Sequence, residues 1–141
     1  MAVTPPSVTV SRFEILDDEE CLRLLGREPV GRIALTSAAL PVVLPVNFVV
    51  VDRTIVFASD PGLKLEAARA GQVACLEVDG FEVFAKSGWS VLATGRLAEI
   101  TDADRLTAAH RLPLSPWALS EPHHFVELSI ELLSGRRIRR P

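Results

Sequence analysis

The sequence contains no tyrosine, which excludes a tyrosine as a proton donor. It also lacks the runs Gly-x-Gly-x-x-Gly, Gly-x-Ser-x-Gly and His-Glu-x-x-His and any Walker loop. These absences remove the common dinucleotide-binding, hydrolase, zinc-protease and nucleotide-hydrolysing interpretations. If the protein carries out redox chemistry, a cofactor must supply it, because no residue pattern predicts a catalytic side chain.

Cysteine is scarce as well. Cys21 and Cys75 lack the spacing of zinc ligands, and no pair of the three histidines has metal-binding spacing, so no metal site is expected. We interpret both cysteines as reduced core residues of a cytoplasmic protein. The first residues show no basic segment followed by an apolar one, so we expect no secretory signal.

Long apolar runs and an excess of basic charge are also missing. The longest apolar stretch, residues 38–46, contains two prolines and is shorter than the roughly 20 residues that span a bilayer. The formal net charge is -3, which does not favour a polyanion as partner. The one dense basic run, residues 136–140, is interpreted as a solvated chain end, with contact to a phosphate as the alternative. We therefore expect neither a nucleic-acid nor a membrane partner.

The patterns that are present predict a mainly β chain with short helices. Helices are expected at 17–26, at 63–70 before Gly71, and from 103 to about 112 behind the cap Asp102. Strands are expected at 31–36, 45–51, 54–58, 72–79, 89–100 and 125–130, with a loop at 80–88 and a bulge at Gly95. These six strands without βα alternation predict an antiparallel barrel. Residues 1–11 are expected to form a flexible arm, and residues 12–141 a single domain.

Five segments occur in an order that resembles a known family. They are Gly31-Arg32-Ile33-Ala34, Leu44-Pro45-Val46-Asn47-Phe48, Phe57-Ala58-Ser59, Gly62-Leu63-Lys64-Leu65 and the stretch from Gly88-Trp89-Ser90-Val91 to Gly95-Arg96. Over roughly residues 12–138 the chain resembles the pyridoxamine 5′-phosphate oxidase-like split barrels. It is most similar to the short actinobacterial-type members related to nitroimidazole-resistance proteins.

The resemblance implies a six-stranded antiparallel split barrel that forms a homodimer, with flavin mononucleotide (FMN) bound at the subunit interface. It also implies a small-molecule substrate. The arginine-rich set and the C-terminal segment of the enzymes that form pyridoxal phosphate have no counterpart here. Oxidation of pyridoxamine phosphate itself is therefore not predicted.

Lys64 and Ser59 are the candidates for binding the flavin phosphate. Lys64 opens a short predicted helix, where free backbone N–H groups and a point charge attract phosphate. By position Lys64 resembles the family's phosphate-binding lysine, and Ser59 is the candidate hydroxyl donor to the same group. A solvated helix lysine is the alternative for Lys64.

Asn47 and Phe48 lie on the segment that resembles the strand along the flavin ring. An amide within an apolar strand is costly unless it is satisfied, and a flavin edge offers both donors and acceptors. The alternative for Asn47 is an outward-facing residue of the alternating pattern. Arg32 and Thr36 point to one face and are also candidates for contacting the cofactor, while Arg32 is equally well explained as a surface residue in an ion pair.

Trp89 and Ser90 begin the strand that, in the family, lies near the dimer interface and the partner's flavin. A tryptophan suits stacking or an interface anchor, and a simple core tryptophan is the alternative. Trp117 is a candidate for covering the substrate side of the ring, or for fixing its own loop.

The resulting hypothesis is a flavin-binding protein that transfers a hydride to or from a small molecule, using FMN or a deazaflavin coenzyme. The alternatives are a module that carries or senses a flavin or haem without turnover, and a dimeric scaffold whose site has decayed.

Overall fold

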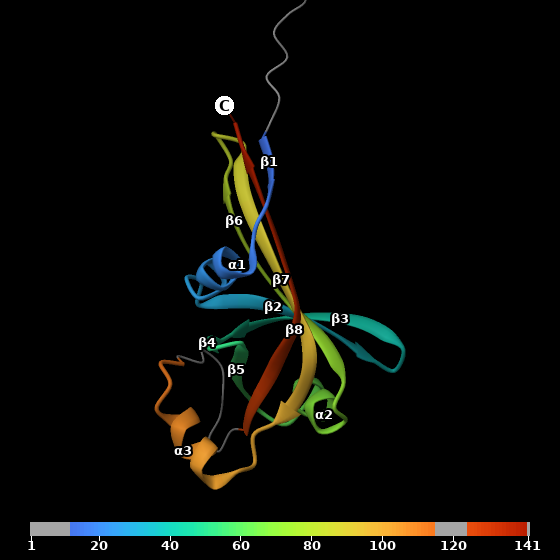
Figure 1. Cartoon of the computed structure of the whole chain (residues 1–141). Coiled ribbons are helices and arrows are strands. Elements are labelled where there is room, and N and C mark those ends of the chain that lie inside the picture. The colour runs from blue at the N-terminus through green and yellow to red at the C-terminus, as the bar shows by residue number, and fades with distance from the viewer. Residues whose placement is uncertain (1–11, 115–123, 141) are drawn as a thin grey trace, which may run out of the picture.

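The computed structural model describes residues 12–114 and 124–140, which form one antiparallel sheet with three short helices (Figure 1). The elements are β1 (Arg12–Ile15), α1 (Asp18–Leu25), β2 (Val30–Ser37), β3 (Leu40–Asn47), β4 (Val49–Val51), β5 (Thr54–Ser59), α2 (Leu63–Arg69), β6 (Val73–Glu82), β7 (Ser87–Glu99), α3 (Ala103–His110) and β8 (His124–Arg139). The mainly β, antiparallel split-barrel class is confirmed. The predicted arm at 1–11, Trp117 and His123 lie outside the described residues.

The strand count of six was wrong, because these residues form eight strands. The stretch predicted as one strand at 45–51 is divided between β3 and β4 at Phe48. The backbone N–H of Phe48 leaves the ladder to donate to the carbonyl of Pro29 at 3.3 Å, and its ring enters the core. A short first strand, β1, pairs with the C-terminal part of β8 and had no strong pattern of its own.

The sheet runs in the order β3-β2-β6-β7-β8-β5-β4, with β1 also paired to β8. β8 pairs with β7 over most of its length, with β5 through its first half and with β1 near its end. This last strand was predicted to stop at residue 130, and the loop at 80–88 shrinks to a tight turn between β6 and β7. The bulge predicted at Gly95 is confirmed by the register shift between Thr94 and Gly95.

The basic run at the end of β8 is not simply solvated, as the sequence suggested. The Arg137 side chain is 15% exposed, and its guanidinium donates to the carboxylates of Glu20 at 2.6 Å and Glu14 at 3.3 Å. These bonds fasten α1 and β1 to β8. The basic residue at 137 therefore has a structural role that local sequence does not reveal.

Helix caps follow the sequence closely. The carboxylate of Asp17 accepts a hydrogen bond from the backbone N–H of Glu20 at 2.9 Å, and that of Asp102 accepts one from Arg105 at 3.0 Å. Each cap satisfies an orphan N–H group of a first helical turn.

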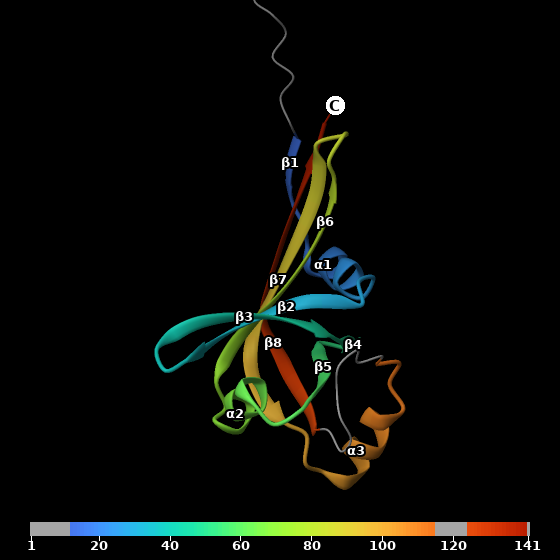
Figure 2. The ribbon, with the colours of Figure 1, turned by 180° about the vertical axis from the view of Figure 1, so that it is seen from behind.

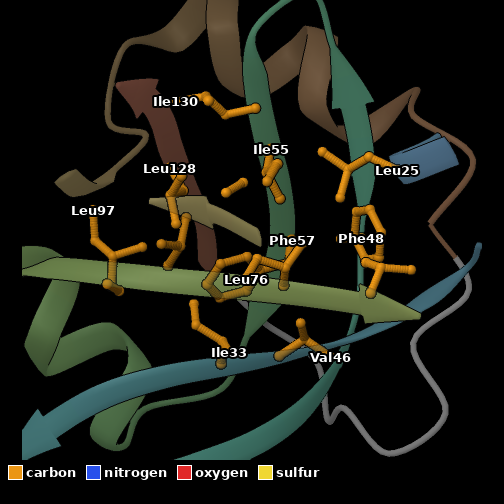
Figure 3. Close-up of a cluster of buried hydrophobic side chains, with 14 of the residues drawn as sticks. Leu25, Ile33, Val46, Phe48, Ile55, Phe57, Leu76, Leu97, Leu128 and Ile130 are labelled. Carbon is orange, nitrogen blue, oxygen red and sulfur yellow. The ribbon is translucent and has the colours of Figure 1, made fainter. Parts of the chain in front are cut away.

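Apolar side chains of β2, β3, β5, β6, β7 and β8 meet in the main core (Figure 3). Phe57, Ile33, Leu76, Leu97 and Leu128 are fully buried there. Burial of each such side chain contributes roughly 1.5–3 kcal/mol to folding. Cys21 is buried in this core as predicted, whereas Cys75 is only half-buried and its Sγ lies 3.3 Å from the Thr94 Oγ1. None of the described helices is long and apolar enough to cross a bilayer.

Among the described residues, no helix covers one surface of the sheet. α1 packs on one side of the long arm made by β1, β6, β7 and β8 (Figures 1 and 2). Cross-strand register places the alternate side chains of β1, β2, β3, β6, β7 and β8 on the other side, which we call the open face. Its exposed apolar side chains are Phe13, Ile15, Val43, Val73, Phe81, Leu92, Leu132 and Ile138.

Candidate functional site

Ser59 and Lys64 lie together at a depression of about 260 Å³. Residues 59–64 form most of its wall, since β5 ends at Ser59 and α2 begins at Leu63, and Leu44 of β3 closes the remaining side. The sequence predicted this proximity because only the Asp-Pro-Gly break and Leu63 separate the two residues.

The Lys64 side chain is half-buried at this depression. Burial lowers the pKa of its ammonium group, because desolvation disfavours the charged form, and the charge of Asp60 acts in the opposite direction. Among the described residues Lys64 makes no hydrogen bond or salt bridge. An anion placed here would therefore compensate a charge that the fold leaves partly desolvated.

The Ser59 hydroxyl is almost completely buried and donates to the carbonyl of Asp60 at 2.8 Å. It is thus committed to its own turn. To donate to a phosphate, as the sequence suggested, the hydroxyl would have to rotate away from that carbonyl.

A second group of candidates lies on the open face. Strand alternation and register place Arg32, Thr36, Asn47 and Ser90 there. Arg32 is exposed and lies 3.7 Å from a carboxylate oxygen of Asp79, so the ion-pair alternative describes its state in this structure. The Asn47 Nδ2 donates to the carbonyl of Pro29, the residue that precedes β2, at 3.5 Å.

Thr36 is engaged through its backbone. Its N–H donates to the Gln72 Oε1 at 2.7 Å, and its carbonyl accepts from the Gln72 Nε2 at 2.8 Å. The Thr36 side chain remains exposed on the open face. A contact from Thr36 to a cofactor would therefore have to come from its hydroxyl.

The side chains of Phe48 and Trp89 do not lie at the Ser59–Lys64 depression, although Trp89 lines a hollow of about 320 Å³ together with Ser90. The Phe48 ring is buried in the core. Trp89 points to the side of β7 opposite Ser90, where a side chain on Gly80 would collide with its indole nitrogen at 2.7 Å. Gln72, three residues beyond α2, accepts a hydrogen bond from Leu97 of β7, and Leu97 is eight residues from Trp89, which is roughly 26 Å along a strand. One chain therefore does not bring Trp89 to Lys64.

Sequence reasoning missed two acidic residues on the open face. Glu77 and Asp79 alternate along β6, and Glu77 is directly opposite Arg32. Burial raises the pKa of Glu77 to about 7, assisted by the hydrogen bond and the charge of Asp79 and opposed by Arg32. The alternation of two acids in an otherwise apolar strand is the signal that could have found them. Within the described part of the chain, no three metal-ligating residues gather at one point.

The fold is thus an antiparallel split barrel with a lysine-containing depression at one edge. Residues 17–137 match the family described as pyridoxamine 5′-phosphate oxidase, and the chain belongs to this family.

Three known proteins illustrate the likeness. The uncharacterized protein Rv0080 of Mycobacterium tuberculosis is 34% identical over 128 residues, covering 87% of this chain and 84% of the relative. The structure of the FAD binding protein from Mycobacterium smegmatis superposes with a TM-score of 0.74 at 32% identity, covering 89% of this chain and 97% of that one. A FAD-binding protein from Mesorhizobium loti gives a TM-score of 0.77 at 27% identity, covering 93% and 100%.

Proposed function

We propose that the chain binds a flavin through its ribityl phosphate at the Ser59–Lys64 depression and works as a flavin-dependent oxidoreductase on a small molecule. The observation that carries the proposal is Lys64, a half-buried cation that makes no hydrogen bond or salt bridge among the described residues, at a depression of about 260 Å³. The similarity to two FAD-binding proteins, at 32% and 27% identity, supports a flavin as the ligand.

The depression is too small for a whole flavin. Ligand pockets usually measure about 300–1,000 Å³, so this one suits the phosphate and part of the ribityl chain. The ring must then lie outside it. The open face, which carries Arg32, Asn47 and Ser90 beside a set of exposed apolar side chains, is the surface that we assign to the ring.

We further propose that a second copy completes the site. Exposed apolar patches of this extent are characteristic of interaction surfaces. In a dimer, the partner's Trp89 is free to approach the flavin even though Trp89 and Lys64 are far apart within one chain.

The chain's own part in the chemistry is binding and orientation. A bound flavin supplies hydride transfer. Lys64 neutralises phosphate charge, and Arg32 with Asn47 offers donors to the ring edge. Glu77, whose pKa is raised to about 7, is the group on the open face suited to exchanging a proton at neutral pH.

Titration of the purified protein with FMN, FAD, a deazaflavin coenzyme and riboflavin tests the proposal. Riboflavin shares the ring but lacks the phosphate, so we expect it to bind less tightly than FMN. Lys64→Ala should weaken FMN binding by about 1.5–3 kcal/mol, roughly 10- to 150-fold, and leave riboflavin unchanged. Lys86→Ala, which removes the exposed lysine of the β6–β7 turn, is the matched control and should bind FMN as the natural sequence does.

Failure of the natural sequence to bind any of the phosphorylated coenzymes would reject flavin binding. Equal losses in Lys64→Ala and Lys86→Ala would reject the phosphate site. Bleaching of the bound flavin by a nicotinamide donor, followed by reoxidation with a small electrophile, separates an oxidoreductase from a carrier.

A further inference from the structure

Gln72 makes hydrogen bonds with all four of its polar groups, and these bonds reach three different elements. Its backbone N–H donates to the carbonyl of Ala67 in α2 at 3.0 Å. Its carbonyl accepts from the backbone N–H of Leu97 in β7 at 2.9 Å. Its side-chain amide exchanges two bonds with the backbone of Thr36 in β2, at 2.7 and 2.8 Å.

The side-chain amide takes the place of a strand residue. The ladder between β2 and β6 ends at the pair Ala34–Cys75. The backbone N–H and carbonyl of Thr36 come after this last pair and therefore have no partner in the backbone of β6. The Gln72 amide supplies one acceptor and one donor at this point, as the backbone of another strand residue would. Loss of the amide would leave two backbone groups of Thr36 dependent on water.

Further bonds hold the connection between α2 and β6, which contains Gln72, and the end of α2. The Arg96 guanidinium of β7 donates to the carbonyl of Gly71 at 2.6 Å, and the Arg69 Nε donates to the Glu99 Oε1 at 2.8 Å. Gly71 itself has a φ of +64°, a conformation that favours glycine and closes the helix. The C-terminal end of α2 is thus attached to the sheet at several points.

We infer that Gln72 is a positioning residue for the phosphate site: by joining α2 to β2 and β7 it sets where α2 presents Lys64. This inference rests on the role proposed for Lys64. α2 has only seven residues, and Leu65, Ala67 and Ala68 bury its inner side, so we expect it to shift as a unit. A shift at its C-terminal end therefore displaces Lys64 relative to Leu44 and Ser59.

The first test uses lysine reactivity and needs no flavin. Lys64 and Lys86 are the two lysines of the chain, so acetylation followed by mass spectrometry reports each one separately. Gln72→Ala should raise the labelling of half-buried Lys64 relative to exposed Lys86 by about threefold or more, because a less firmly attached helix opens more often. Gln72→Glu, which retains an acceptor for the Thr36 N–H but at neutral pH cannot donate to its carbonyl, should give an intermediate ratio.

A structural control is available in α3. Arg105 ties that helix to β8 through an ion pair with Glu127. Arg105→Ala should lower stability without changing the ratio of Lys64 to Lys86 labelling. If Gln72→Ala leaves that ratio unchanged, or Arg105→Ala raises it equally, the positioning role is overturned.

The second test uses binding. Gln72→Ala should weaken FMN binding by about tenfold and riboflavin binding by less than about twofold, and in a Lys64→Ala background it should have little further effect on FMN. Equal losses for FMN and riboflavin would mean general damage and would refute the inference. If the natural sequence binds no flavin while Gln72→Ala still exposes Lys64, the proposed function fails and the positioning of Lys64 stands.

Discussion

The guanidinium of Arg32 lies 3.7 Å from the Oδ2 of Asp79, and this pair stands beside Glu77 on the open face. Within the described residues, the Oε1 of Glu77 is buried and has no hydrogen-bond partner. The cluster therefore contains two acids and one base, with one carboxyl group that is poorly solvated. Its charge state depends on pH near neutrality.

The first prediction concerns the pH dependence of stability. The pKa of Glu77 is raised from 4.5 to about 7 in the folded chain, so between these values the folded state holds more protons than the unfolded state. The contribution of Glu77 to the free energy of unfolding must then fall as the pH rises through this window, and level off above about 7. Glu77→Gln should remove this decline. Urea unfolding from about pH 5 to about pH 8 measures it.

Glu82→Gln, at an exposed position on the same strand, is the control and should follow the natural sequence at every pH. A constant difference between Glu77→Gln and the natural sequence across the range would show that Glu77 titrates normally.

The second prediction concerns self-association through the open face. Leu132 lies on the open face and is 69% exposed, and Leu132→Glu should shift the proposed dimer towards the monomer because it places a charge in an apolar contact. Leu40→Glu changes a similarly exposed residue, 65%, at the turn between β2 and β3, and should leave the assembly unchanged. Sedimentation velocity compares the two. A monomeric natural sequence, or equal effects of both substitutions, would contradict the use of this face.

The third prediction concerns the bulge. A Cβ atom on Gly95 would lie 1.7 Å from the carbonyl oxygen of Ser129, which is backbone and cannot rotate away. Gly95→Ala should therefore destabilise the fold by about 3 kcal/mol or more, at or beyond the upper end of overpacking effects. Gly26→Ala, whose Cβ would meet its nearest neighbour at an ordinary 3.5 Å, should be tolerated. Thermal unfolding compares the stability of the two variants, and similar melting temperatures would contradict the predicted collision at Gly95.

The contrast between local and distant relationships explains what the sequence could predict. Ser59 and Lys64 are five residues apart across a Pro-Gly break, so their shared depression follows from local structure. Asp102 and the Gly95 bulge are equally local signals. These features were predictable because each depends on a few residues that are neighbours in the sequence.

Features that depend on tertiary contacts were not predictable. The two bonds between Gln72 and Thr36 span 36 residues, and the ion pairs of Arg137 span more than 100. The end of β8 forms a strand because β1 and β7 flank it, although its Arg-rich sequence reads as a tail. The Phe48 ring packs in the core for the same reason, since the break between β3 and β4 involves the hydrogen bond from Phe48 to Pro29.

The last prediction is the counterpart of the first, because the pKa of a second glutamate, Glu99, is shifted in the opposite direction. Glu99 accepts hydrogen bonds from Arg69 at 2.8 Å and contacts the Nδ1 of His124 at 3.0 Å. Chiefly through the bond from Arg69, the pKa of Glu99 is lowered from 4.5. Its contribution to stability is therefore present above about pH 4.5 and is lost as the pH falls through the lower, folded value.

Glu99→Gln keeps the size of the side chain but removes its charge. We expect it to cost about 0.5–1 kcal/mol at neutral pH, the scale of a partly exposed ion pair, and to cost less as the pH falls below about 4.5. Glu77→Gln should have the opposite sign: above about pH 7 it should be more stable than the natural sequence, because the charged form of Glu77 destabilises the fold there. Urea unfolding of both variants across a pH series extended from about pH 8 down to about pH 3 checks the two signs against each other. Parallel curves for Glu99→Gln and the natural sequence in acid would contradict the role of the Arg69–Glu99 contact.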